Sequence, residues 1–505
     1  MERTRFENGN INGARCDLYV HAGVIERIMP AGERPLDAPV TDNTVDLAGA
    51  FVYPGFRDAH CHIFSAAETR LGLDASGFRQ ASDLIKAGRR YLAETGRTAV
   101  YAKHLVDTTF DGARMPGKDV LDQISTAFPV IVERVCGHLA SVNSVVLAAL
   151  PVLRQRYPDG VILENDIDLL PSLRDLNGED DFRATLAEVV RSLLAFGITA
   201  VSSNDFGRFG EATDELLLQK VLDEFPGFSY RSQYAPDLPF ERNDLLMLAM
   251  KAGVRPAVKV FRDGSLGGRT AWLREPYADA PDTVGQDTLD DATHEAVFDT
   301  ANRLGLQVMT HAIGDRAIAR TLDAFEKTSD PQNPLRHAIV HAQITDDALL
   351  ERMRRLNVLA IVQPQFTTSD AAMAPVRLGA RYGTAYRFKQ MADAGMRVAF
   401  SSDAPVESFN PLLTLQAAML GKAGQPDTAF SFADALVLHT AGAAYVDFAE
   451  TDCGRLEVGC RADFCTFDRD LVALPPAELA GQRPLLTVAG GHVYRQAPVN
   501  RSSPA

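Results

Sequence analysis

The sequence predicts an α/β protein built on a (β/α)8 TIM barrel. In the middle of the chain, apolar strand candidates alternate with amphipathic helical stretches, which is the pattern of repeated βα units. Eight such strands can be counted, the number that closes a barrel of this kind. No GxGxxG sequence follows a strand, which disfavours a doubly wound sheet, the structural alternative.

The two ends of the chain differ from the middle. Residues 1–53 and 454–495 consist of short β-type runs broken by Gly, Asn and Asp. Neither end is large enough to bury a good core alone. We therefore expect residues 1–54 and 455–505 to form one composite β-sandwich domain, with a barrel over residues 55–454 inserted between them.

The first barrel strand is expected to end at His60, and a very long connection follows it. We expect residues 64–196 to form a mostly helical insertion, which carries the sequence GHLASVNSVVL at residues 137–147. Beyond it, strands are separated by helices with apolar residues at i, i+3 and i+4. The remaining strand candidates are 197–205, 228–236, 255–264, 305–315, 337–344, 357–366 and 396–405.

Composition and charge narrow the function classes. Apolar residues make up 46% and charged residues 23%, as in an ordinary globular enzyme. The net charge of -15 and the absence of a Lys/Arg run disfavour nucleic acid and membrane surfaces as partners. We see no signal peptide, no membrane span and no disulfide pattern among the six cysteines. We expect a cytoplasmic enzyme with a small-molecule substrate, and the sequence leaves open whether it is a homo-oligomer.

Potential metal ligands recur at the carboxyl ends of the predicted strands, where barrel enzymes place their active sites. His60 and His62 share one face of the first strand, because side chains at i and i+2 point the same way. Carboxylates and imidazoles suit Zn2+ or another divalent first-row metal. A single histidine of this kind could be an ordinary packing residue, but the recurrence favours a metal centre. The later strands contribute Lys259, His311, His341 and Asp403.

Several motifs resemble those of the amidohydrolase superfamily, most closely its branch of N-substituted formamide deformylase-like metal-dependent hydrolases. The end of the chain, with ADFCTFDRD and VAGGHVYR, is similar to the composite β-sandwich of that superfamily. The segment GHLASVNSVVL resembles a motif in the insertion of this branch. The resemblance spans nearly the whole chain and does not specify a substrate. The barrel motifs that carry it are DAHCH, VKVFRDGSLGGRTA, THAIGDRAI, VHAQI, VQPQF and SSDAPVESFNPL.

The resemblance implies a binuclear centre, with two Zn2+ ions per chain. His60 and His62 would bind the more buried metal together with Asp403, while His311 and His341 would bind the second metal. Asp403 would also be the catalytic residue, which accepts a proton from the metal-activated water and returns it to the leaving nitrogen.

The resemblance also implies that Lys259 is carboxylated by carbon dioxide and bridges both ions. A carbamate offers two anionic oxygens to the metals, whereas a free ammonium beside two dications would be repelled. The alternative is a mononuclear site in which Lys259 contacts the substrate.

A further set of residues is expected to contact substrate. His138 lies in the insertion, which we expect to determine substrate choice, although His138 could instead have a capping or packing role. Arg269 and Trp272 follow the strand of Lys259. Gln363 ends the seventh strand and could also be a hydrogen-bonded barrel residue. Arg262 either tunes specificity or faces solvent.

We expect this enzyme to hydrolyse a carbon–nitrogen bond in a small amide, such as an N-formyl or N-acyl compound. Cyclic amide or imide hydrolysis and ester or lactone cleavage are the alternatives. A deaminase is disfavoured, because HxE and PCxxC signatures are missing and Gly314 and Asp315 stand where barrel deaminases typically carry a glutamate. A non-catalytic binding protein would be expected to lack the metal ligands.

Overall fold

The computed structural model describes residues 2–33, 40–134, 139–207, 212–236, 238 and 256–495. The chain divides into two compact units, one made of Met1–Ile63 with Val190–Ala505 and the other of Phe64–Val189. Within the described ranges, no helix has both the length and the apolar character needed to cross a membrane.

The larger unit contains the expected barrel. Its eight strands form one sheet in the order β6-β12-β13-β14-β15-β16-β17-β18, and every neighbouring pair is parallel. The predicted (β/α)8 fold is therefore confirmed. The strands are β6 (Phe56–Cys61), β12 (Ile198–Gly207), β13 (Ser229–Ala235), β14 (Ala257–Phe261), β15 (Gln307–Ala312), β16 (Ala338–His341), β17 (Leu359–Val362) and β18 (Val398–Phe400).

Backbone hydrogen bonds link the end of the first strand to the segment that follows the last. The amide of Asp403 donates to the carbonyl of His60 at 2.9 Å, and the amide of His62 donates to the carbonyl of Ala404 at 2.8 Å. Asp58 adds a side-chain link, because it accepts hydrogen bonds from the amide and hydroxyl of Ser402 at 3.0 and 2.5 Å. These contacts bring the ends of β6 and β18 together at the carboxyl edge of the barrel.

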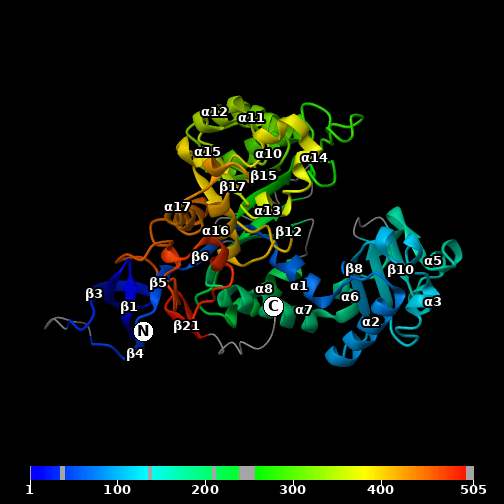
Figure 1. The fold of residues 1–505 in the computed structure, drawn as a ribbon, viewed down its shortest axis with the longest axis horizontal. Helices are drawn as coiled ribbons and strands as arrows, with labels where there is room; N and C mark the ends of the chain where they lie inside the picture. Colours follow the sequence, from blue (N-terminus) through cyan, green and yellow to red (C-terminus); the bar gives the residue numbers. More distant parts are fainter. Residues whose placement is uncertain are drawn as a thin grey trace. The chain divides into compact units, whose positions relative to one another are not determined.

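Helices surround the barrel strands (Figure 1). The helices α10 (Asp291–Leu304), α11 (Asp315–Thr328) and α12 (Asp347–Arg355) coincide with the amphipathic stretches of the sequence. Asp290 and Asp346 cap α10 and α12 by accepting hydrogen bonds from backbone amides of the first turn. The other α-helices of this unit in the described residues are α8 (Ala212–Asp223), α13 (Phe366–Ser369), α14 (Ala374–Leu378), α15 (Phe388–Asp393), α16 (Pro411–Leu420), α17 (Phe432–Leu438), α18 (Ala441–Val446) and α19 (Pro476–Leu479).

The two ends of the chain share a second sheet, so that the blue and red strands lie side by side in Figure 1. The junction is the antiparallel pairing of β5 with β19, and Phe6 packs edge-on against Phe464 with ring centroids 5.0 Å apart. The composite terminal domain is thus confirmed as part of the fold, while its exact boundaries stay a prediction. Its strands are β1 (Arg3–Ile11), β2 (Ala14–His21), β3 (Val24–Pro30), β4 (Asn43–Asp46), β5 (Phe51–Pro54), β19 (Phe464–Phe467), β20 (Leu486–Ala489) and β21 (His492–Arg495).

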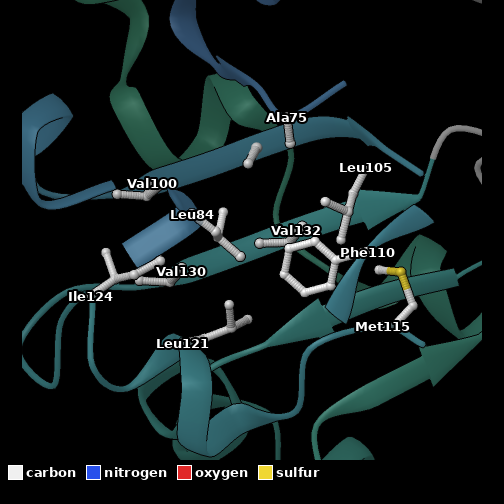
Figure 2. Close-up of a cluster of buried hydrophobic side chains, with 11 residues drawn as sticks. Ala75, Leu84, Val100, Leu105, Phe110, Met115, Leu121, Ile124, Val130 and Val132 are labelled. Atoms are coloured by element: carbon white, nitrogen blue, oxygen red, sulfur yellow. The ribbon is translucent and has the colours of Figure 1, made fainter. Parts of the chain in front are cut away.

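The smaller unit is the insertion, and it contains more β-structure than the sequence suggested. A five-stranded sheet of β7 (Leu73–Asp74), β8 (Val100–Leu105), β9 (Val130–Arg134), β10 (Leu139–Val142) and β11 (Val161–Leu163) accompanies the helices. Side chains from β8, β9 and the helix α2 (Ala81–Thr95) gather with Phe110 into one core (Figure 2). Among the described residues, its α-helices are α2 (Ala81–Thr95), α3 (Lys118–Leu121), α4 (Ser144–Ala149), α5 (Pro151–Arg156) and α6 (Leu173–Asn177). The helices α1 (Ile63–Leu71) and α7 (Glu179–Ala195) contain the points of the chain at which the unit begins and ends.

Candidate metal centre

Three candidate ligand atoms converge at the carboxyl edge of the barrel. The Nε2 atoms of His60 and His62 lie 3.2 and 3.3 Å from the same carboxylate oxygen, Oδ1 of Asp403. These three residues offer ligand atoms that all lie within 4.8 Å of one another. His60 and Asp403 are buried, and the side chain of His62 is 21% exposed. The backbone bonds between the strand ends create this juxtaposition.

Hydrogen bonds on the far side of each ring define which nitrogen carries the proton. The amide nitrogen of Gln233 donates to the carbonyls of Ala59 and Ser202, so its oxygen must face His60 Nδ1, at 2.6 Å. The Nδ1 atom of His62 similarly faces the carbonyl oxygen of Asn204 at 2.9 Å. Both oxygens only accept, so each Nδ1 is the donor. In a neutral imidazole, Nε2 is then a bare lone pair.

The charge states of His60, His62 and Asp403 favour the binding of a cation. Burial lowers the pKa of His60 to about 3, so its ring is neutral at neutral pH. Burial also opposes ionisation of Asp403, but the neighbouring His60 and His62 hold the pKa of that carboxyl well below its usual value. Burial lowers and the Asp403 carboxylate raises the pKa of His62, with a net increase. A proton on His62 satisfies one contact, whereas a divalent metal satisfies all three, so this donor set fits such an ion.

His311 and His341 extend this cluster. Their ring centroids lie 4.5 Å apart, and His341 lies 5.8 Å from His60 by the same measure. His341 Nδ1 donates to the oxygen of Gln363 at 2.9 Å, which leaves Nε2 available as a ligand. In contrast, His311 Nε2 donates to the carbonyl of Gly264 at 3.1 Å, which leaves Nδ1 available. The two rings would therefore use different nitrogens to bind a metal.

Lys259 lies in β14 close to these histidines and is only 1% exposed. Its Nζ is 3.9 Å from the ring centroid of Phe261. Burial lowers the pKa values of His60 and His341, and the positive charge of Lys259 lowers them further. All six expected metal-site residues thus lie at one end of the barrel: His60, His62, Lys259, His311, His341 and Asp403.

A buried carboxylate holds the loop after β14 against the loop after β15. Asp263 accepts backbone hydrogen bonds from Trp272 at 2.9 Å, Ile313 at 3.0 Å and Gly314 at 2.7 Å. Burial raises the pKa of Asp263 to about 7, although these hydrogen bonds favour its ionised form. A Cβ on Gly314 would lie 2.1 Å from the carbonyl oxygen of Trp272, so only glycine permits this approach. Contacts with the residues that follow β15 therefore hold the loop that carries Trp272 in place.

The expected substrate contacts differ in their surroundings. Arg269 has a left-handed backbone (φ 55°) and pairs with Asp279 through Nε at 3.3 Å and Nη2 at 2.8 Å. Gln363 is fully buried, and besides His341 it contacts the hydroxyl of Ser401 at 2.8 Å. The structure thus places Gln363 behind a metal-ligand candidate. His138 lies outside the described residues.

Arg262 does not face solvent, so that alternative is wrong. Its side chain is fully buried and pairs with Asp287 at 3.1 Å and Asp291 at 2.5 Å. Its guanidinium carbon also lies 5.0 Å from the ring of Trp272. Trp272 is partly buried beneath this cation, so Arg262 supports the position of the indole.

Sequence reasoning missed the residues that orient the ligands. Asp58, Asn204, Gln233 and Asp263 are all buried and contact a ligand candidate or its loop. Asp58 and Asp263 stand inside the motifs DAHCH and FRDG, and Asn204 and Gln233 interrupt predicted strands. A buried polar side chain requires a partner, and for Asp58, Gln233 and Asp263 that is the available signal. Asn204 contacts His62 through its backbone carbonyl, which no side-chain pattern marks.

A cavity of about 300 Å3 lies between α13, which follows β17, and the segment after β18 that leads into α16. Gln365, Ser369, Glu407 and Gln416 are among the residues that line it. The first two follow Gln363 in the chain and Glu407 follows Asp403, so the cavity is at the same end of the barrel as the ligand cluster. It combines apolar walls with several hydrogen-bonding groups, as small-molecule sites do.

A parallel barrel with a His-His-Asp cluster at its carboxyl edge is the arrangement of a metal-dependent enzyme. A family model described as "Amidohydrolase family" matches residues 43–494. The chain belongs to this family. The Bacillus subtilis (strain 168) protein YtcJ is 29% identical, with 97% of each chain covered. The N-substituted formamide deformylase of Arthrobacter pascens is 24% identical over 88% of this chain and 89% of its own.

A solved structure shares this fold. An uncharacterized metal-dependent hydrolase from Pyrococcus horikoshii OT3 superposes with a TM-score of 0.78 and 27% identity. The match covers 94% of this chain and 99% of the other. The resemblance to the amidohydrolase superfamily inferred from the motifs is thereby confirmed.

Proposed function

We propose that this protein hydrolyses a carbon–nitrogen bond of a small, non-peptide amide, with an N-formyl or N-acyl compound as the substrate class. The observation that carries the proposal is the convergence of His60 Nε2 and His62 Nε2 on Asp403 Oδ1. The relative named N-substituted formamide deformylase supports the choice of substrate class.

In this proposal, the residues of the site have separate roles in the reaction. A bound divalent metal, which we propose to be Zn2+, would polarise the scissile carbonyl and lower the pKa of water. Asp403, held ionised, accepts the proton of the attacking water on its carboxylate and delivers it to the leaving nitrogen. Gln233 and Gln363 fix the rings of His60 and His341.

We propose two metals and a carboxylated Lys259 as the complete centre. His60, His62 and Asp403 would hold one ion, and His311 and His341 the other. The support is the burial of Lys259 beside three neutral imidazoles, where an ammonium costs most and a carbamate would attract cations.

The test compares metal-loaded with chelator-treated protein on a panel of N-formyl amides, N-acyl amides, cyclic amides and esters. We expect the fastest turnover on an open-chain amide, and loss of that turnover after chelation with recovery on adding Zn2+. The His60→Ala variant should lose both metal and turnover. Turnover that survives chelation, or a panel cleaved only at cyclic amides or esters, would refute the proposal.

A further inference from the structure

A second cavity, of about 440 Å3, lies at the opposite end of the barrel from the metal-ligand candidates. Arg57 and Arg231 line it from the first residues of β6 and β13, whereas His60 and His62 lie at the far end of β6. Arg461 lines it from the segment before β19. None of these arginines belongs to the proposed catalytic machinery.

Arg57 is 95% buried, with 5% of its surface exposed, yet only part of its guanidinium has a partner. Its Nη2 pairs with Asp447 Oδ2 at 3.2 Å. Its Nε and Nη1 have no hydrogen-bond partner among the described residues. A guanidinium stays charged at any pH a protein tolerates, and a buried charged donor without an acceptor is costly. These N–H groups therefore need an acceptor from outside the described protein.

The charges around the cavity favour an anion as that acceptor. Asp447 is shared, because its other oxygen pairs with Arg231 at 3.1 Å. Arg461 pairs with Asp463 at 3.2 Å and also donates to the hydroxyl of Ser229 and the carbonyl of Gly227. Three guanidiniums therefore line this partly enclosed space, and Asp447 is the one carboxylate among its described lining residues. A cation would be repelled there, whereas a negative charge would be attracted.

The N–H groups of Arg57 that lack a partner also indicate which class of ligand the cavity can bind. The Nε–H of Arg57 and its Nη1 hydrogens point to different sides of the guanidinium group, so each offers its own charge-assisted hydrogen bond to an oxyanion oxygen. The cavity is larger than a single water requires. We propose that it binds the oxyanion group of a small molecule, with Arg57 as the principal contact and Arg461 as the second.

The test titrates inorganic phosphate, and separately acetate, into the full-length metal-loaded protein at constant ionic strength, with calorimetry and thermal unfolding as readouts. We expect saturable binding and a higher Tm for at least one anion. Arg57→Gln should weaken it about tenfold or more, the effect of losing charge-assisted hydrogen bonds. Arg469→Gln, at an exposed arginine paired with Glu478, is the matched control and should bind as the wild type.

Metal content is measured in every variant, because phosphate can also contact a metal and Arg57 precedes His60 by three residues. If Arg57→Gln does not fold, Arg461→Gln decides, since that side chain is 26% exposed and should tolerate the change. Binding confined to one anion identifies the class of ligand. A cavity filled by water alone gives no saturable binding in the wild type, and an unchanged Kd in Arg57→Gln or Arg461→Gln equally overturns the proposal.

Discussion

Gln233→Met should weaken metal binding without touching a metal ligand. The substitution removes the acceptor of His60 Nδ1, which lies 2.6 Å away, and the donors to the carbonyls of Ala59 and Ser202. Without the acceptor, the His60 ring is free to place its proton on Nε2, where it competes with a metal. Loss of such a contact typically lowers metal affinity by about 10- to 100-fold. Loss of the two hydrogen bonds to these carbonyls should also lower the free energy of unfolding by about 1–3 kcal/mol.

The assay is competition for Zn2+ with a chromophoric chelator, together with thermal unfolding of the same samples. Gln307→Met is a matched control, because Gln307 is equally buried and bonds to Arg231 and to the carbonyl of Arg336. It should lose a similar amount of stability and keep wild-type metal affinity. If Gln233→Met binds Zn2+ as the wild type does, or if both variants lose affinity equally, the orientation argument is wrong.

Four further outcomes are expected. Lys259→Ala should lose bound metal and most turnover, with partial recovery on adding short carboxylic acids; a structure with an unmodified Lys259 turned away from the histidines would contradict this. His311→Ala should bind about half the metal of the wild type, measured by atomic emission, because the ligands of the other ion remain; full metal with unchanged turnover would sink the two-metal assignment. His138→Ala should change kcat/KM and substrate ranking while metal content stays constant, as two competing substrates would reveal; wild-type efficiency on both would make its motif structural. Phe110→Ala should destabilise the insertion by about 3–5 kcal/mol, since its buried ring leaves a cavity in that core; an unchanged thermal transition would contradict the packing seen in Figure 2.

Local patterns were enough to predict the barrel and the residues gathered at its edge. Apolar runs of strand length, separated by helices of period 3.6, can bury themselves only as repeated βα units. Because parallel strands end at the same rim, polar residues in or at the ends of those strands, such as Lys259 and His341, are expected to meet there. The five-stranded sheet of the insertion was not foreseen, since its strands are short and three of them pair in parallel. Short apolar runs do not distinguish strand from helix.

The sequence alone determined which residue types reach the site, and the tertiary structure decided how each one is used. Which nitrogen of His60 faces Asp403 depends on Gln233, 173 residues away, and the approach of β6 to β18 depends on the contact of Asp58 with Ser402, across 344 residues. Arg262 illustrates the same limit, because only the positions of Asp287 and Asp291 make a buried charge acceptable there. Hydrogen bonds and ion pairs act over about 3 Å, so their partners are defined only once the strands have been brought together.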